Sequence, residues 1–283
     1  MPRKFRRVYE KLDIAKKYVT SFFQGSRYEE FFGDIEKYCM FIGYPRSGHS
    51  LVGSLLDAHK NMIIAHELDA LKYLESGFSR NQLYHLIFEN SKNFNEMDRK
   101  WTGYSYWVPN QWHGRFSELK IIGDKKGSRS VLRFIRNPGI LQKLRDEIDV
   151  EIKFIHVTRN PFDNISRMFL KSRAKKKITL NEVIESYFSR AEAIHDMKQE
   201  IADEDILEIT QESLIDAPEA TLRDICIFLE LEAAEDYLED CASIIFKSPK
   251  KSRLETEWDP ASIKVIEEKI EAYPFFRGYS FEE

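Results

Sequence analysis

Residues 43–50, Gly-Tyr-Pro-Arg-Ser-Gly-His-Ser, constrain the fold more than any other segment, because a glycine-framed loop of this kind joins a strand to a helix. An apolar run at residues 38–42 precedes the loop, and a helical period of leucines starts at Leu51. The loop fits the phosphate-binding pattern G-x-x-x-x-G-K-[ST], except that His49 stands in the lysine position. The sequence therefore predicts a buried strand, an anion-binding loop and a helix over residues 38–60.

This loop contains candidate hydrogen-bond donors for a bound anion. Backbone N–H groups at a helix N-terminus favour negative charge, and an arginine side chain offers a fork that suits phosphate. The candidate binding residues are Arg46, Ser47, Gly48, His49 and Ser50. The alternative is an ordinary tight turn between a strand and a helix.

Composition narrows the class of protein. A chain of 283 residues that is 42% hydrophobic can bury roughly three quarters of its unfolded surface, so one domain over residues 1–283 is expected. The net charge of −4 argues against a nucleic-acid partner, which requires a clustered positive excess. We expect no transmembrane segment and no secretory signal. Three widely spaced cysteines in apolar surroundings indicate core thiols, and we expect a cytoplasmic protein.

Strand-like apolar runs alternate with helical stretches along the chain, which predicts an α/β fold with a parallel sheet flanked by helices. The expected strands are 38–44, 61–65, 119–123, 151–157 and 205–209. Ligands of such sheets bind at the carboxyl ends of the strands. Before the first strand, residues 1–25 form a predicted amphipathic helix, which either packs on the domain or docks on a membrane surface.

Two further segments carry basic residues at suitable places. In residues 151–173, a strand ends at Arg159, Pro161 starts a helix, and Ser166 and Arg167 follow about two turns later, which predicts a second phosphate site. The alternative is that Arg159 only pairs with a carboxylate. Residues 247–258 form a basic, proline-broken loop that is either a third contact to a nucleotide or a solvated charge run. Its candidate binding residues are Lys251, Ser252 and Arg253.

In order and separation, these three segments resemble the nucleotide-contacting elements of sulfotransferases that use 3′-phosphoadenosine 5′-phosphosulfate (PAPS). The resemblance covers residues 38–273, and the first loop is similar to the arginine-bearing branch that includes tyrosylprotein and many bacterial sulfotransferases. It implies a three-layer, P-loop-like fold and release of adenosine 3′,5′-bisphosphate (PAP). His49 stands at a loop position where the family usually has threonine or serine. Arg167 occupies the usual serine position, so either Arg167 or Ser166 is expected to hold the 3′-phosphate.

The resemblance also implies catalytic roles. Glu67 matches the base of the tyrosylprotein branch, Lys125 matches a lysine near the transferring group, and Arg46 and His49 would face the 5′-phosphate. An aromatic segment at residues 101–116 is expected either to contact the acceptor or to pack as a small satellite core. The candidate acceptor-binding residues are His66, Trp107, Trp112 and His113, the two histidines being reserve bases.

The sequence thus predicts a sulfotransferase that moves a sulfuryl group from PAPS to a hydroxyl or amine by in-line displacement, without a metal. The rivals are a P-loop nucleotide kinase and a nucleotide-binding module without chemistry. The missing lysine and the lack of an acidic magnesium-binding strand count against the kinase. The acceptor and the oligomeric state stay open.

Overall fold

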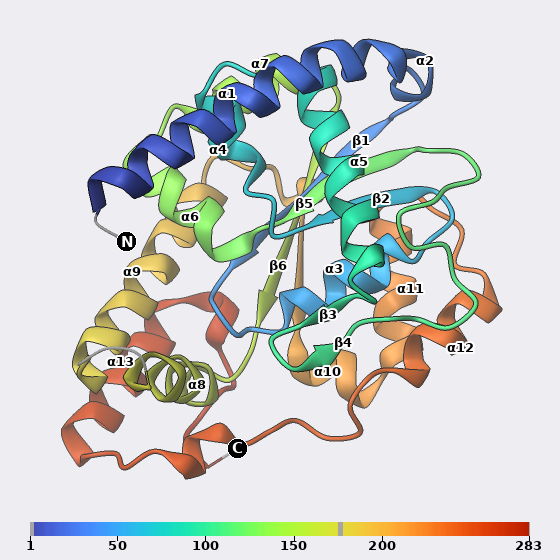
Figure 1. Ribbon diagram of the computed structural model, residues 1–283. Coiled ribbons are helices and arrows are strands. Elements are labelled where there is room, and N and C mark those ends of the chain that lie inside the picture. Colours follow the sequence, from blue (N-terminus) through green and yellow to red (C-terminus); the bar gives the residue numbers. More distant parts are fainter. Residues whose placement is uncertain (1–2, 175–177, 283) are drawn as a thin grey trace. The chain divides into compact units, whose positions relative to one another are not determined.

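The structure of the protein is a computed structural model that describes residues 3–174 and 178–282 (Figure 1). Residues 1–2 of the predicted N-terminal helix lie outside the described residues. The main helices are α1 (Arg3–Arg27), α2 (Glu29–Phe32), α3 (His49–Asp57), α4 (Ala70–Glu75), α5 (Arg80–Glu96), α6 (Gly127–Arg136), α7 (Ile140–Ile148), α8 (Pro161–Arg173), α9 (Leu180–Lys198), α10 (Gln211–Asp216), α11 (Pro218–Phe228), α12 (Glu235–Ser243) and α13 (Pro260–Ala272). The strands are β1 (Lys37–Gly43), β2 (Met62–His66), β3 (Lys100–Trp101), β4 (Tyr104–Ser105), β5 (Ile121–Lys125), β6 (Glu151–Thr158) and β7 (Ile206–Thr210).

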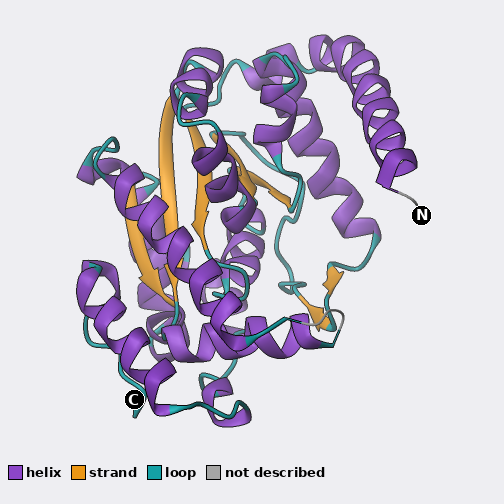
Figure 2. Ribbon diagram, turned by 90° about the vertical axis from the view of Figure 1, so that its left-hand side faces the viewer, coloured by secondary structure: helices purple, strands orange, loops and turns teal. Residues whose placement is uncertain are grey.

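Five of these strands form one sheet in the order β2-β5-β1-β6-β7. β5 pairs in parallel with both β1 and β2, and β6 pairs in parallel with β7. Helices run beside these strands in Figure 2. The predicted α/β fold with a parallel sheet flanked by helices is confirmed. Each of the five predicted strands is present, although β5 begins and ends two residues later than expected and so includes Asp124 and Lys125.

The chain divides into two compact units. Unit 1 consists of Met1–Met40, Gly53–Lys126 and Arg136–Ile152, and unit 2 of Phe41–Val52, Gly127–Ile135 and Lys153–Glu283. β1 therefore starts in unit 1 and ends in unit 2. The single domain expected from composition stays a prediction.

In unit 1, β2 and β5 are buried along their whole length, as is typical of parallel strands covered on both faces. α5 packs on both strands, and α1 packs on α5. A capping box between Ser79 and Gln82 starts α5 by satisfying backbone donors at its first turn. These contacts give unit 1 its core.

In unit 2, α8 follows β6 directly and packs on η2 (Ser252–Glu255), a short 3₁₀ turn inside the predicted basic loop. Pro161 is at the start of α8, as predicted, and the Asn160 side chain caps the helix by accepting a hydrogen bond from the Phe162 N–H. The core includes stacked rings of Tyr44 and Tyr187, whose centroids are 4.4 Å apart.

Two further observations concern the whole described chain. Over residues 3–174 and 178–282, no helix is both long and apolar enough to cross a membrane. The three cysteines, Cys39, Cys226 and Cys241, are buried free thiols. Burial raises the pKa of the Cys226 thiol to about 12, so it is protonated at neutral pH.

Candidate functional site

The predicted anion-binding loop lies in unit 2, between the end of β1 at Gly43 and the start of α3 at His49. Arg46 has a φ angle of 72°, in the left-handed region that few residues other than glycine adopt. Ser47 is fully buried, and its Oγ lies 3.2 Å from Nδ1 of His49. His49 thus binds back to the loop at the first residue of α3, where the helix dipole favours an anion.

The loop is tied to α8 within the same unit. The side-chain amide of Asn164 donates a hydrogen bond to the Pro45 carbonyl at 2.8 Å, although the two residues are 119 positions apart. The predicted first and second anion-binding segments are therefore in contact. Sequence reasoning missed Asn164, and the only signal was its place just after the Arg-Asn-Pro-Phe-Asp run.

Arg159 stands at the carboxyl end of β6 and is only 5% exposed. Its Nη2 donates to the Lys250 carbonyl and, at 3.4 Å, to Oγ of Ser252. Its Nε–H is buried and has no hydrogen-bond partner among the residues that the structure describes. A buried guanidinium keeps its charge, so an unsatisfied donor there is a site for an anion.

Neighbouring charges shift the pKa of the Arg159 guanidinium in both directions. Burial lowers the pKa of Arg159, while Asp163 and Glu212 raise it and the positive charge of Arg167 lowers it again. A bound phosphate would attract both Arg159 and Arg167 and so offset the repulsion between them. The electrostatics of this part of unit 2 therefore suit an anion.

Glu212 fixes the backbone at the end of β6, and sequence reasoning missed this role. One carboxylate oxygen accepts from the Asn160 N–H at 3.0 Å, and the other accepts from the Tyr279 hydroxyl at 2.8 Å. The residue belongs to the Gln-Glu-Ser-Leu run after β7, which was the only signal for it.

The basic loop at residues 247–258 is held in place rather than solvated. Arg253 forms a buried ion pair with Asp163, with Nη1 3.1 Å from Oδ2, and its backbone N–H donates to the other carboxylate oxygen at 2.8 Å. Its Nη2 is buried and has no partner in the described part of the chain. Ser252 is also fully buried, whereas Lys251 is exposed. The charge-run alternative therefore fails for Arg253 and Ser252.

Ser166 and Arg167 have different surroundings, although they are neighbours on α8. Ser166 is fully buried, and its hydroxyl donates to the Ser252 carbonyl at 2.6 Å and lies 2.5 Å from the hydroxyl of Thr256. Arg167 is half-buried and interacts electrostatically with Glu255 as well as with Arg159. Ser166 therefore fastens the basic loop, and Arg167 has the charge and exposure to meet an anion.

In unit 1, the predicted catalytic residues Glu67 and Lys125 are in direct contact. Oε1 of Glu67 lies 2.6 Å from Nζ of Lys125, and Oε2 pairs with Nζ of Lys126. Lys125 is buried, which lowers its pKa to about 8 even though the charge of Glu67 opposes this shift. Two ammonium groups thus hold one carboxylate just after β2.

Two neighbouring residues position this pair. Asp124 accepts hydrogen bonds from the backbone N–H groups of Leu68 and Ala70, and so fixes the chain that follows Glu67. Burial raises the pKa of Asp124 to about 7. Gly53 makes room for the lysine, because a Cβ at this position would lie 2.4 Å from Cγ of Lys125. Neither role was predicted from the sequence.

The predicted acceptor-binding residues also lie in unit 1, with unequal exposure. Trp107 and Trp112 are exposed, and so are Trp101 and Tyr104 on the short β3-β4 hairpin. His66 is buried, and its ring stacks on Phe94 with centroids 3.9 Å apart.

His113 is buried and lies within the loop itself. Its Nε2 is 2.9 Å from the backbone nitrogen of Val108, and burial lowers its pKa to about 4. It is therefore neutral near pH 7 and holds the aromatic segment together.

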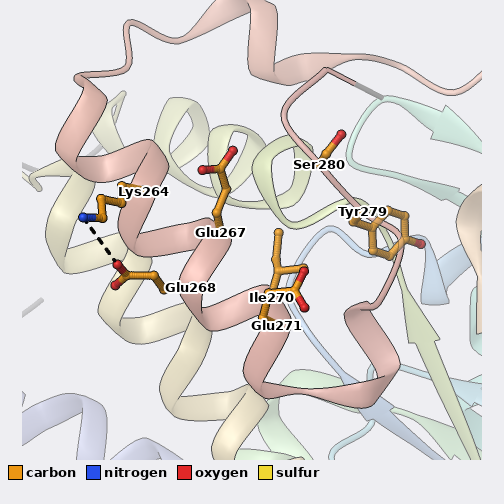
Figure 3. Close-up of a pocket in the computed structure, with 7 residues that line it drawn as sticks. All are labelled: Lys264, Glu267, Glu268, Ile270, Glu271, Tyr279 and Ser280. Atoms are coloured by element: carbon orange, nitrogen blue, oxygen red, sulfur yellow. Dashed lines mark ion pairs between the residues drawn. The ribbon is translucent and has the colours of Figure 1, made fainter.

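A surface pocket of about 460 Å³ lies elsewhere in unit 2, along α13 and the C-terminal segment (Figure 3). Glu267, Glu268 and Glu271 line it, and Lys264 pairs with Glu268. Three carboxylates against one lysine do not suit a polyphosphate, and none of the predicted binding residues lines this pocket. We assign it no role in nucleotide binding.

The described residues contain no group of three or more His, Cys, Asp or Glu side chains arranged to hold a metal ion. That the reaction needs no metal stays a prediction.

Comparison with known proteins shows what this chain is similar to. The model of the sulfotransferase family matches residues 151–236, which carry β6, Arg159 and α8. The structure is similar to the sulfotransferase domain from the curacin biosynthetic pathway, at 13% identity and a TM-score of 0.51, covering 84% of this chain and 98% of that one. No curated protein matches the sequence significantly.

Two mycobacterial sulfotransferases have the same level of similarity. STF9 from Mycobacterium avium is 12% identical with a TM-score of 0.51, covering 91% of this chain and 81% of that one. STF1 from Mycobacterium tuberculosis is 12% identical with the same TM-score, covering 88% and 80%. The family match over residues 151–236 agrees with the resemblance found in the sequence, and these structures share the fold of the chain.

Proposed function

We propose that the protein is a PAPS-dependent sulfotransferase, transferring a sulfuryl group to a hydroxyl or amine and releasing PAP. The observation that carries this proposal is the buried guanidinium of Arg159. Its Nε–H has no partner among the described residues. The same guanidinium lies beside Ser252 and is repelled by the positive charge of Arg167. A donor with a 3′-phosphate needs a second cationic site of this kind. Adenosine triphosphate does not.

In this proposal, unit 2 binds the donor. Arg159 and Arg167 bind the 3′-phosphate, and Ser166 positions the basic loop by its hydrogen bond to the Ser252 carbonyl. Arg253 contributes its unsatisfied Nη2 while Asp163 neutralises its charge. The remaining donor-binding residues of the basic loop are Lys251 and Ser252.

The loop between β1 and α3 binds the 5′ end of the donor. The guanidinium of Arg46 and the first turn of α3 stabilise negative charge on the leaving phosphate, without a metal. His49 acts there as a hydrogen-bond donor, and its contact with Ser47 selects its orientation. The remaining residues assigned to this loop are Ser47, Gly48 and Ser50.

Unit 1 activates the acceptor. Glu67 takes the proton from the acceptor hydroxyl as the new oxygen–sulfur bond forms and the bond from sulfur to the leaving phosphate oxygen breaks. Lys125 and Lys126 orient the carboxylate through their ion pairs with it. We assign acceptor contacts to Trp107 and Trp112, which are exposed, and to His66 and His113, which support them from the interior.

The two rivals make different predictions. A nucleotide kinase requires magnesium, so chelation with EDTA would abolish its turnover. A binding module without chemistry uses Arg46 and Arg159 but has no need of Glu67. We expect turnover that survives EDTA and depends on Glu67.

The test is an acceptor screen with labelled donor, scored by mass shift, and then repeated with two variants. Arg46→Ala is expected to weaken both PAP binding and turnover. Glu67→Gln keeps the shape of the side chain but removes its basicity, so PAP affinity should stay near that of the wild type while kcat falls about 10²-fold or more. Full activity of Glu67→Gln on an alkyl alcohol, together with loss in His66→Asn, would move the base to a histidine.

For location we propose the cytoplasm, which the three buried free thiols support.

A further inference from the structure

Helix α1 in unit 1 exposes a row of large apolar side chains. Each of the following is more than half exposed: Phe5, Val8, Tyr9, Leu12, Val19, Phe22 and Phe23. Their spacing follows the three- and four-residue steps of one helix face, with Phe5, Leu12 and Val19 at intervals of seven. Scattered exposed apolar residues are ordinary, but a continuous row along one helix is the mark of an interaction surface.

The opposite face of α1 is the one that packs on the rest of unit 1. There, Ser21 and Gly25 are buried, and a Cβ at Gly25 would lie 2.8 Å from the Asn81 carbonyl oxygen on α5. The Gln82 amide donates to the Tyr18 carbonyl at 2.9 Å, and Lys17 donates to the Tyr73 hydroxyl at 2.9 Å. These contacts fix the rotation of α1, so its apolar row faces away from α5.

The sequence of α1 is strongly basic in an acidic chain. The helix contains eight lysine or arginine residues and two acidic residues, a net charge of +6. The whole chain has a net charge of −4, so the residues outside α1 sum to −10. Lys11 and Lys16 are exposed on the same helix. A basic polar face beside a row of Phe, Tyr, Leu and Val is the composition of helices that lie in the interface of an anionic bilayer.

We propose that the apolar face of α1 docks the protein on the surface of a membrane that contains anionic lipids. The rings of Phe22 and Phe23 and the side chain of Leu12 enter the boundary between headgroups and acyl chains, and the lysines bind lipid phosphates. A second copy of the chain is the other occupant that such a row of apolar residues suits. Dimerisation through α1 is disfavoured, because two α1 helices with a net charge of +6 each would repel one another.

The test is co-sedimentation of the full-length protein with vesicles. One set contains phosphatidylcholine alone, and the other contains equal amounts of phosphatidylcholine and phosphatidylglycerol. We expect at least tenfold stronger partitioning to the anionic vesicles, falling as salt is raised. Equal partitioning to both sets, or none to either, would overturn the proposal.

Matched variants separate apolar insertion from charge. Leu12→Asn with Phe22→Asn should reduce partitioning about tenfold or more, because buried apolar area is lost. Ile227→Asn is the control, since Ile227 is an equally exposed apolar residue on α11. Lys11→Glu with Lys16→Glu should remove the preference for anionic vesicles. These five positions are outside the proposed site, so PAP affinity should be unchanged in every variant.

Light scattering tests the alternative that a second copy of the chain binds the apolar row. A dimer that Leu12→Asn with Phe22→Asn converts to a monomer, together with no vesicle binding by the wild type, would assign the row to a second copy instead. The proposal does not rest on the enzymatic function, because the vesicle assay needs neither donor nor acceptor.

Discussion

The ion pair between Asp163 and Arg253 should be the strongest single tie between α8 and the basic loop. The two side chains are 3% and 2% exposed, and Asp163 also accepts from the Arg253 backbone N–H. Asp163→Ala therefore leaves a buried guanidinium without its counter-ion and a backbone donor without its acceptor. Breaking a buried pair in this way costs about 3–5 kcal/mol. At about 2–4 °C per kcal/mol for a large domain, the melting midpoint should fall by roughly 10 °C.

Thermal and urea unfolding of the purified variant measure this loss. The control is Glu268→Gln, which breaks the exposed pair with Lys264 on α13 and should leave the midpoint nearly unchanged. The double variant Asp163→Leu with Arg253→Met replaces the charges by apolar volume and should recover most of the lost stability. A loss below about 1 kcal/mol in Asp163→Ala would refute the reasoning, because the loop would then be held by other contacts.

Three more predictions follow from the site. Arg167→Ala should weaken PAP binding without much loss of stability, whereas Ser166→Ala should lower stability first; calorimetry and thermal unfolding separate the two. The pKa of His113 is about 4 in the folded protein and about 6.5 when unfolded, so the folded state binds fewer protons between these pH values. The free energy of unfolding should therefore decline by roughly 3 kcal/mol as pH falls from about 6.5 to about 4. His113→Gln should flatten this decline. Gly53→Ala should displace Lys125, lowering kcat in the acceptor assay while PAP affinity is kept.

The sheet was predictable because its strands are nearly continuous apolar runs, which buried parallel strands require. The place of Arg159 followed from the same logic, since the residue after β6 must lie at the carboxyl edge. Pro161 marked the start of α8 because its missing N–H costs nothing at the first helical position. Local physical rules were sufficient for these features.

The partners of the site residues were not predictable, because they come from distant parts of the chain. Asp163 meets Arg253 across 90 positions, and Asn164 meets Pro45 across 119. The contact between Glu67 and Lys125 spans 58 positions. No local pattern fixes such pairs, since they depend on how the strands are ordered in the sheet.

Three short elements were not predicted from the sequence. β3 and β4 are two residues each, too short to show the alternation of a strand. The 3₁₀ turn at Ser252–Glu255 lies in a segment whose charge and proline predicted an open loop, and α8 packs against it.

The central claim is that the chain recognises a nucleotide by its 3′-phosphate, and calorimetry with PAP and with adenosine monophosphate tests it most directly. Wild-type protein should bind PAP more tightly by roughly 1.5–3 kcal/mol, or about 10- to 150-fold, as expected for a charge-assisted contact at Arg159. Arg159→Ala should erase most of that preference. Equal affinities of the wild type for the two nucleotides would contradict the account.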